Sequence, residues 1–386
     1  MNFDLTDDQK MLVETVQSFV KKDSPVERMR RLRSDPIAWE KTVWKQMGEL
    51  GWLGVMFPES VGGLGMSFVE AGLIIEQLGT TLVPEPYLPS VVLAGTALSR
   101  AGSAEQQERW LAPMLAGDTS LALGFSEEQS RFDVTNVRTR AEKSGAKYTL
   151  RGAKRFVLNG HAADQIIVSA RTSGDELDAK GVSLFVLDRA QPGLKIRPVD
   201  CMDSKKAALL ELDGVEVEKD RLLGAEGEAG PLLDLIHDYG AAAACAEGSG
   251  VMQTVLMMTR NYLTERKQFG VAIGTFQALQ HRAVDMFVET ELAKSTAILA
   301  MLKVSDENPE ERRRAISAAK TQLGVSGGFV VRQGTQLHGG IGVTDEHDVG
   351  LYFKRMQILS TLFGDDVFHT RRFASLSTFT KNIQAA

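Results

Sequence analysis

The sequence has few cysteines, and this limits the site chemistry that it can support. Its 386 residues include two, Cys201 and Cys245. Their spacing matches neither a CxxC pair nor a set of metal ligands. We therefore expect no metal site, no structural disulfide and a reducing, cytoplasmic compartment.

Long apolar runs, a basic leader and an excess of positive charge are also lacking. The longest apolar stretch, 239–259, is interrupted by Glu247, Ser249 and Gln253, so no membrane insertion is expected. The first 20 residues are acidic and amphipathic, which is not the pattern of a signal peptide. A formal net charge of −6 argues against nucleic acid as a partner.

Common short site motifs are missing as well. The chain contains no GxGxxG, Walker or HExxH pattern, so the corresponding nucleotide and zinc-protease sites lose support.

The local composition and apolar periodicity of the chain instead predict three domains and an α+β fold. Residues 1–117 show helical periodicity, with Thr6 as the cap of the first helix. Residues 118–227 hold short β-forming runs separated by turn pairs, which predicts a barrel or sandwich. Residues 228–386 return to long helices, as in an antiparallel four-helix bundle. The helices expected are 37–50, 67–78, 104–116, 230–265, 276–303, 309–337 and 366–380, and the turn pairs are Asn159–Gly160, Pro192–Gly193 and Asp213–Gly214.

Glu247 is an isolated carboxylate in the helical run AAAACAEGSG. It is the only charged residue between Asp238 and Arg260. Burial of an unpaired carboxylate is costly and raises its basicity. Two interpretations are open. Glu247 is either a core residue paired with an arginine from another helix, or a base beside a flat ligand that the small residues Ala243, Ala244 and Gly250 would accommodate.

Two further segments have both a ligand-binding and a structural interpretation. The glycines of QLHGGIG (336–342) either let the backbone approach a phosphate or simply end a helix. In TERKQFGVAIGTFQ (264–277), Arg266 and Gln277 would suit a pyrophosphate and a base or ribose, or belong to a charged helix end.

Taken together and in this order, five segments make the whole chain resemble the acyl-CoA dehydrogenase family. The resemblance implies an N-terminal helical domain, a β-barrel-like middle domain and a C-terminal four-helix bundle. It also implies bound FAD, an acyl-CoA substrate and reoxidation by an electron-transfer flavoprotein. The segments are FDLTDDQKMLVETVQSFV (3–20), ELGWLGVMFPESVGGLGMS (49–67), RGAKRFVLNGHAADQIIVSART (151–172), ERKQFG with IGTFQALQHRAVDM (265–286), and QLHGGIG.

The family resemblance assigns eight residues to FAD, several of them to the flavin of a neighbouring subunit, so an oligomer is implied. Two supporting positions depart from the family pattern: Leu158 replaces a threonine, and QSRFD (129–133) replaces the AGSD segment that contacts CoA. The eight residues are Ser126, Phe156, Arg266, Phe269, Gln277, Gln336, Gly339 and Gly340.

Neither residue that usually serves as the base in this family is present. Phe363 stands at the glutamate of the Tyr-Glu-Gly-Thr motif, and Gly240 stands at the alternative position. With the resemblance, Glu247, about two helical turns after Gly240, becomes the candidate catalytic base, and its small neighbours become space for thioester and flavin.

LFGDD, ERRRAISAAK and AACAE-xx-G resemble one group within the family. This group comprises the pimeloyl-CoA dehydrogenase small subunit and the heteromeric steroid-type dehydrogenases. The expected assembly is a homo- or hetero-tetramer with a second dehydrogenase-like subunit. A non-catalytic partner subunit and a different flavin reaction, such as that of an oxidase or desulfinase, are the alternatives.

Overall fold

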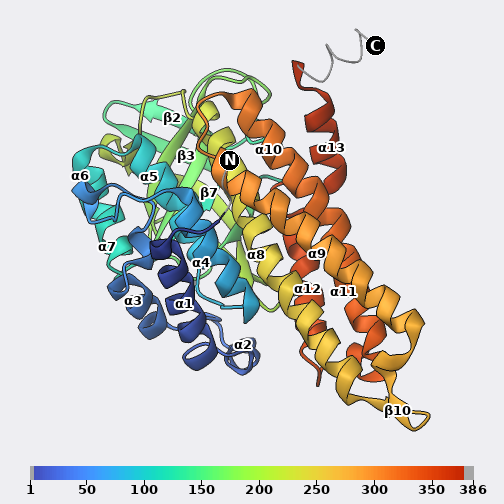
Figure 1. Cartoon of the computed structure of the whole chain (residues 1–386). Helices are drawn as coiled ribbons and strands as arrows, with labels where there is room; N and C mark the ends of the chain where they lie inside the picture. The colour runs from blue at the N-terminus through green and yellow to red at the C-terminus, as the bar shows by residue number, and fades with distance from the viewer. Residues whose placement is uncertain (1–3, 378–386) are drawn as a thin grey trace. The chain divides into compact units, whose positions relative to one another are not determined.

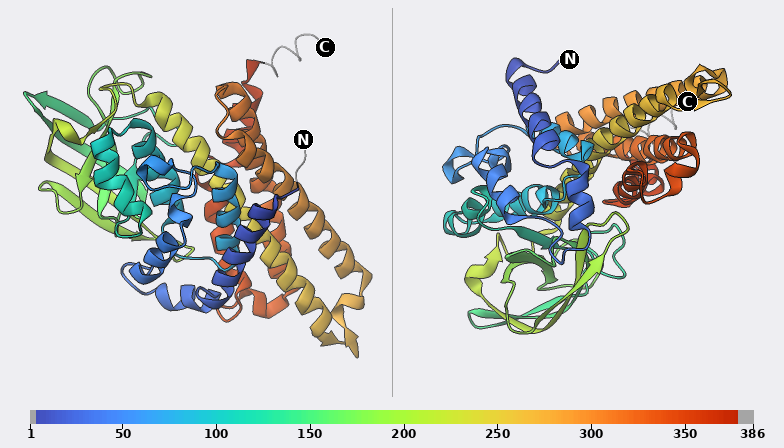
Figure 2. Two further views of the ribbon diagram at one scale, coloured as in Figure 1. Left: turned by 60° about the vertical axis from the view of Figure 1, so that its left-hand side comes forward. Right: turned by 90° about the horizontal axis from the view of Figure 1, so that it is seen from below.

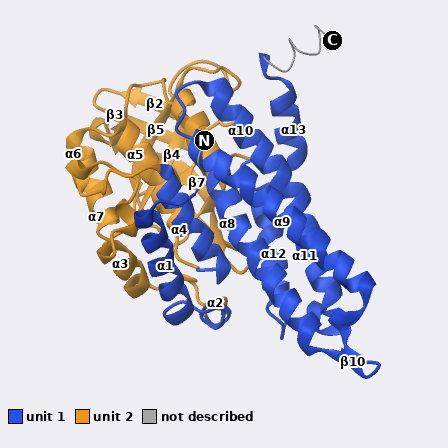
Figure 3. Cartoon of the chain, viewed as in Figure 1, with its two compact units in different colours: residues 1–31, 68–83, 241–386 blue, residues 32–67, 84–240 orange. Residues whose placement is uncertain are grey.

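The computed structural model describes residues 4–377. The chain groups into two compact units (Figure 3). Unit 1 holds residues 1–31, 68–83 and 241–386, and unit 2 holds residues 32–67 and 84–240. Each unit is therefore assembled from segments that lie far apart in the sequence.

Unit 1 is helical. Thr6 caps its first helix through a capping box with Gln9, as the sequence predicts. The long helices α8, α9, α11 and α12 run beside one another (Figure 1), and α1 packs against α4. The helices of this unit are α1 (Asp7–Lys22), α2 (Val26–Leu32), α4 (Phe68–Thr80), α8 (Gly230–Glu265, which begins in unit 2), α9 (Gln277–Lys303), α10 (Pro309–Gln322), α11 (Gly328–Leu337), α12 (Val349–Thr361) and α13 (Asp366–Ala374).

Helix α9 has two apolar faces. Met286, Thr290 and Ala293 are buried on one face. Phe287 and Leu292 are about half exposed, at 52% and 48%. One side of α9 thus faces the helices of its own unit while the other is left uncovered in the single chain.

Unit 2 combines a curved sheet with short helices. The strand order is β6-β7-β3-β2-β4-β5-β8, and β1 adds in parallel to β4. The right-hand view of Figure 2 shows these strands curling around. The strands are β1 (Leu121–Gly124), β2 (Arg140–Ser144), β3 (Lys147–Leu158), β4 (Gln165–Arg171), β5 (Val182–Asp188), β6 (Leu194–Asp200), β7 (Lys206–Glu218) and β8 (Leu222–Leu223); the helices are α3 (Lys41–Glu49), α5 (Thr96–Ala101), α6 (Ala104–Gln106) and α7 (Ala112–Leu115).

The core of the sheet comes from alternating apolar residues. Tyr148, Leu150, Ile166, Val168 and Phe185 are almost completely buried in one cluster. Their spacing of two along each strand directs them to the same face of the sheet. The burial of this face explains why the β-forming runs fold together.

The predicted α+β architecture, helical then β then helical, is confirmed. In its details two predictions are wrong. Asp213–Gly214 lies inside β7, where Gly214 has no partner on β3 and adopts a φ of 71°, so it forms a bulge and not a turn. The C-terminal region holds an additional helix, α12, between the third and fourth expected helices. Of the expected helix 366–380, residues 378–380 lie outside the described residues.

Within residues 4–377, no helix combines the length and apolar character needed to cross a membrane.

Candidate functional site

Three of the predicted flavin contacts lie on one connection at the end of α8. Arg266 follows α8 and precedes the hairpin of β9 (Lys267–Gln268) and β10 (Val271–Ala272), and Gln277 begins α9. Phe269, at the tip, has a φ of 54° and is 92% exposed. The backbone carbonyl of Arg266 accepts a hydrogen bond of 2.8 Å from Ile273 N, which closes the connection.

The predicted glycines lie beside the same end of α8. The ring centroids of Tyr262, on α8, and His338 are 4.7 Å apart. Gly339, with a φ of 63°, and Gly340 follow, and a Cβ added at either would meet no atom within 4 Å. The structure therefore brings Gln336, Gly339 and Gly340 to the end of unit 1 where α8 leads into Arg266.

The groups exposed at this end fit an anionic dinucleotide. Arg266 is exposed and makes no ion pair with any residue between 4 and 377. Phe276, at the N-cap of α9, provides no side-chain cap to the first N–H groups of the helix. The buried His338 Nε2 has no hydrogen-bond partner in the described chain. A guanidinium, an uncapped helix start and an open glycine pair are the features that diphosphate binding uses.

The other two predicted flavin contacts, Ser126 and Phe156, belong to unit 2. Arg155 N donates a 2.8 Å hydrogen bond to the Ser126 carbonyl oxygen, which joins the two segments. Phe156 lies in a β-bulge of β3, with a φ of 51°, and is 39% exposed. The left-handed region is unfavourable for an aromatic residue, so the fold must hold this conformation in place.

Glu247, the candidate base, forms a buried ion pair with Arg355 of α12. Its Oε1 accepts a 2.7 Å hydrogen bond from Arg355 Nε, and its Oε2 accepts one of 2.6 Å from Nη2. Both side chains are at least nine-tenths buried. One of the two interpretations of Glu247 is a core residue paired with an arginine from another helix. The two hydrogen bonds to Arg355 are such a pair. Sequence reasoning missed Arg355, which lies on the helix that it did not predict.

The small residues around Glu247 leave no space for a flat ligand at the positions that contact α4. A Cβ added at Gly250 would overlap the carbonyl oxygen of Glu76, and one at Gly79 would lie 2.5 Å from the Glu247 carbonyl oxygen. Leu323 fills the space beside Gly248. The expectation of ligand space is wrong here, because helix packing takes up the room.

A second buried carboxylate, Glu76, lies in the same contact. Its Oε1 accepts a weak hydrogen bond from Ser249 Oγ at 3.4 Å and is 3.7 Å from Lys294 Nζ. Burial raises the pKa of Glu76, and the Lys294 charge and the Ser249 hydrogen bond only partly oppose it. The sequence EQLG (76–79) gives no signal that distinguishes this carboxylate from an exposed one.

Phe363, at one usual base position, lies in a tight turn between α12 and α13. Phe363 and Gly364 adopt φ values of 57° and 104°. The Phe363 carbonyl oxygen lies 2.8 Å from His369 Nε2, and Asp365 caps α13 by accepting a bond from Phe368 N. The Phe363 side chain is buried, at 7% exposure.

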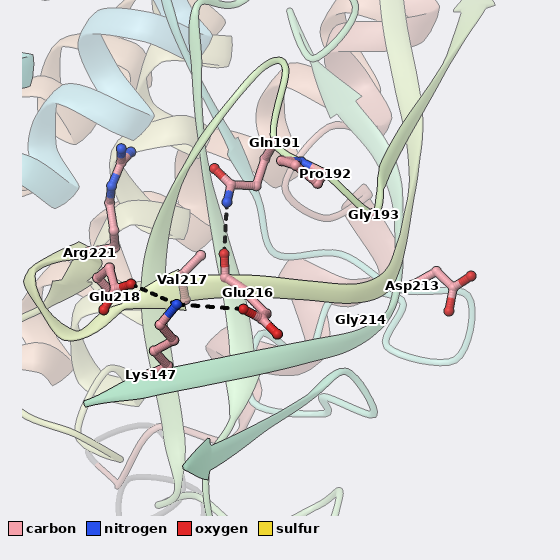
Figure 4. A pocket seen from close by; sticks show the side chains of 10 residues that line it. All are labelled: Lys147, Gln191, Pro192, Gly193, Asp213, Gly214, Glu216, Val217, Glu218 and Arg221. Carbon is pink, nitrogen blue, oxygen red and sulfur yellow. Dashed lines mark hydrogen bonds and ion pairs between the residues drawn. The ribbon is translucent and has the colours of Figure 1, made fainter. Parts of the chain in front are cut away.

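A pocket of about 490 Å³ opens in unit 2 between β3, β7 and the β5–β6 loop (Figure 4). Lys147 in its wall is 3.1 Å from Glu218 and 3.7 Å from Glu216. The other two charged lining residues, Asp213 and Arg221, pair with Arg151 and Asp188 outside the lining. None of the predicted site residues lines this pocket. It is therefore separate from the candidate site.

Comparison with known proteins covers nearly the whole chain. Models of the acyl-CoA dehydrogenase N-terminal, middle and C-terminal domains match residues 6–118, 122–215 and 237–375. The chain is 31% identical over 357 residues to the probable acyl-CoA dehydrogenase YngJ of Bacillus subtilis, which covers 90% of this chain and 92% of that protein.

Solved structures agree with this result. The chain resembles one in the ChsE4–ChsE5 complex from Mycobacterium tuberculosis, with a TM-score of 0.87 and 27% identity, covering 97% of this chain and 98% of that one. It also resembles a chain of a Tcur3481–Tcur3483 steroid ACAD variant, with a TM-score of 0.86 and 27% identity, covering 98% and 99%.

Proposed function

Because the chain belongs to the acyl-CoA dehydrogenase family, whose members are FAD-dependent oxidoreductases acting on CH–CH bonds, we propose that it is a subunit of such an enzyme. The reaction proposed is the oxidation of an acyl-CoA thioester to the trans-2-enoyl-CoA. The arrangement at the end of α8 supports this proposal, because Arg266, the start of α9 and the open Gly339–Gly340 backbone together suit the diphosphate of FAD.

In this reaction a carboxylate removes the α-proton of the substrate while a hydride leaves the β-carbon. When bound, FAD supplies the hydride acceptor. The residues of this chain must hold the cofactor and provide a base in a site from which water is excluded, because an α-proton next to a thioester is only weakly acidic.

In the first form of the proposal, Glu247 is the base. It lies on α8 seven residues after Gly240, which occupies the family's alternative base position. For this role the Arg355 guanidinium would have to release one oxygen of Glu247 when substrate binds, because both oxygens are engaged in the structure.

The second candidate function is a non-catalytic partner subunit, which completes the assembly and the flavin site of a catalytic subunit. The bidentate Glu247–Arg355 pair favours it, since the pair accounts for the buried carboxylate without catalysis. Phe363 and Gly240 at both usual base positions favour it too. The resemblance to chains in the ChsE4–ChsE5 and Tcur3481–Tcur3483 structures supports a heteromeric, steroid-type assembly.

Partners follow from the same proposal. An electron-transfer flavoprotein would reoxidise the enzyme, and the chain would assemble as a tetramer, with itself or with a second dehydrogenase-like subunit. The exposed apolar row on α9, formed by Val284, Phe287, Val288 and Leu292, suits such an assembly.

Three variants separate the two candidates: Glu247→Gln, Arg355→Met and the neutral double variant. If Glu247 is the base, Glu247→Gln retains FAD and lowers turnover of acyl-CoA by about 10²-fold or more, and the double variant does not recover it. If the pair is structural, each single variant is destabilised by about 3–5 kcal/mol, and the double variant recovers both stability and the turnover of the assembly.

The assay uses the chain purified alone and co-expressed with its partner, and it measures enoyl-CoA by mass, bound flavin by absorbance and unfolding by denaturant. Full turnover by Glu247→Gln would exclude the catalytic role. Turnover by the chain alone would exclude the non-catalytic one.

A further inference from the structure

Unit 2 contains a buried ion pair that none of the site predictions includes. Lys154 of β3 is completely buried, and its Nζ lies 2.6 Å from Oε1 of Glu127, which is 7% exposed. Glu127 lies in the loop after β1, 27 residues earlier in the chain. The pair therefore joins this loop to the middle of the sheet.

Each oxygen of the Glu127 carboxylate accepts two hydrogen bonds. Its Oε1 accepts from Lys154 Nζ and from Thr139 N, at 2.6 and 3.1 Å. Its Oε2 accepts from Arg138 N and from Gln129 Nε2, both at 2.8 Å. Two of these donors are backbone groups just before β2, so the carboxylate fixes main-chain positions as well as side chains.

Lys154 extends the network to a fourth segment. Its Nζ also donates a 2.9 Å hydrogen bond to Ser169 Oγ of β4. Its aliphatic stem lies close to Gly124, where an added Cβ would be 3.4 Å from Lys154 Cγ. The network thus connects the end of β1, the start of β2, β3 and β4.

The two predicted flavin contacts of this unit adjoin the pair. Ser126 directly precedes Glu127, and Phe156 follows Lys154 by two residues. The hydrogen bond from Arg155 N to the Ser126 carbonyl lies between them. The strained φ of Phe156 occurs in the bulge that starts at Lys154, where the register with β7 shifts.

Stability alone gives little reason for such a pair. Desolvation of two charges commonly offsets their attraction, and apolar residues of similar volume often replace a buried pair without loss. Its geometric effect is specific, because four directed donors fix the carboxylate in one orientation.

Resting on the proposed function, we propose that Glu127 and Lys154 are positioning residues that hold Ser126 and the Phe156 bulge in the conformation that binds the flavin. Neither side chain is assigned a contact with the flavin or substrate. They act through the two residues that they adjoin.

The test uses the neutral double variant Glu127→Gln/Lys154→Met in the full chain, assembled with its partner where one is required. A single substitution would leave a buried charge unpaired, so the double variant keeps the fold testable. The control is Asp188→Asn/Arg221→Met, which removes a 2.7 Å ion pair of the same unit, between the end of β5 and the turn before β8, that adjoins neither Ser126 nor Phe156.

We expect the double variant to bind FAD at least about tenfold more weakly and to change the flavin absorption spectrum, with an apoprotein melting temperature close to that of the control. Hydrogen exchange of the apoprotein should accelerate at the Arg155 amide and in residues 124–130, but not elsewhere in the sheet. The control should keep the affinity, the spectrum and the exchange pattern.

Unchanged affinity and spectrum in the double variant would overturn the proposal, as would equal losses in the control. If the wild-type protein binds no FAD in any assembly, the proposed function fails. Amide exchange alone then tests whether Glu127 and Lys154 hold Ser126 and the Phe156 bulge in place. Unaltered exchange at Arg155 and residues 124–130 would then overturn the positioning role.

Discussion

At the scale of single residues, Glu76 shows how burial makes stability depend on pH. Its pKa in the folded chain is raised above 4.5, mainly by burial. A group with a raised folded-state pKa contributes stability that is fully present below the unfolded pKa and is lost as pH rises through the folded-state pKa. The stability that Glu76 contributes to unit 1 is therefore lost as the pH rises above about 4.5.

We predict that Glu76→Gln stabilises the protein relative to wild type at neutral pH and that this advantage vanishes near pH 4. The amide keeps the contact with Ser249 and removes the cost of a buried charge. Melting temperatures measured from pH 4 to pH 8 check this, with the exposed Glu265→Gln as control. A constant difference across this range would contradict the prediction.

Two glycines allow structural and ligand-binding roles to be separated. Gly250→Ala should destabilise the fold by about 3 kcal/mol, because the new Cβ would overlap a backbone carbonyl of α4 that no side-chain rotation can move. Chemical denaturation measures this loss.

Gly340→Ala is the complementary variant. Its added Cβ would meet no atom within 4 Å, so stability should change by less than about 0.5 kcal/mol. FAD binding should nevertheless weaken if the backbone lies against the diphosphate. Titration of the apoprotein with FAD measures this, and an unchanged affinity would remove Gly340 from the proposed site.

At the scale of elements, the acid response of unit 2 should depend on the loop after β1. Burial alone would raise the pKa of Glu127, but the Lys154 charge and the hydrogen bonds of Gln129, Lys154 and Thr139 outweigh it and lower the pKa to about 2. Burial also lowers the pKa of Lys154, against the attraction of Glu127. The carboxylate, with four donors, governs the response to acid.

A carboxyl group with a lowered pKa contributes stability above its unfolded pKa, here about 4.5, and this contribution is lost as pH falls toward 2. Wild type should therefore lose stability more steeply between pH 4.5 and pH 2.5 than the variant Glu127→Gln/Lys154→Met. Urea unfolding of both proteins over this interval gives the comparison. If the unfolding free energies of the two proteins fell in parallel over this pH interval, the Glu127–Lys154 pair would not control the loss of stability in acid.

The sequence predicted most helices and strands because their signals are strong: α1 has apolar residues at helical spacing, and β5 is a short run of β-forming residues. It missed α12, whose sequence VGLYFKRMQILST contains several residues common in strands and whose N-terminus has no side-chain cap. The Asp213–Gly214 bulge was mistaken for a turn because both structures favour glycine with a positive φ. Pairing across the sheet decides between them, and this is a tertiary property.

Tertiary contacts also limited what the sequence could predict about the candidate site. Exposed residues beside glycines, such as Arg266 and Phe269, could be proposed from their segments. The partner of Glu247 could not, because Arg355 lies 108 residues away. The sequence also does not reveal that Lys154 is buried, since lysine in a strand is commonly exposed. The chemistry of a carboxylate is set by neighbours that only the fold brings near.

At the scale of the whole molecule, the uncovered face of α9 predicts assembly. Val284 and Phe287 are 57% and 52% exposed on the same helix as Val288 and Leu292. Phe287→Glu should shift the protein to a smaller species, because a buried charge in an apolar contact is costly. Sedimentation velocity checks this, with the exposed Lys21→Glu on α1 as control. An unchanged assembly would exclude α9 from the interface.

The turn at Phe363 has a consequence for how such a protein can diverge. Its backbone path is set by groups outside position 363, namely Gly364, the ring of His369 and the cap by Asp365. The identity of the side chain at 363 is therefore largely uncoupled from the course of the chain. A duplicated gene could exchange an acidic residue for an aromatic one there and keep the same scaffold. Two subunits with one fold could in this way diverge, so that one keeps the catalytic residue and the other evolves a binding role.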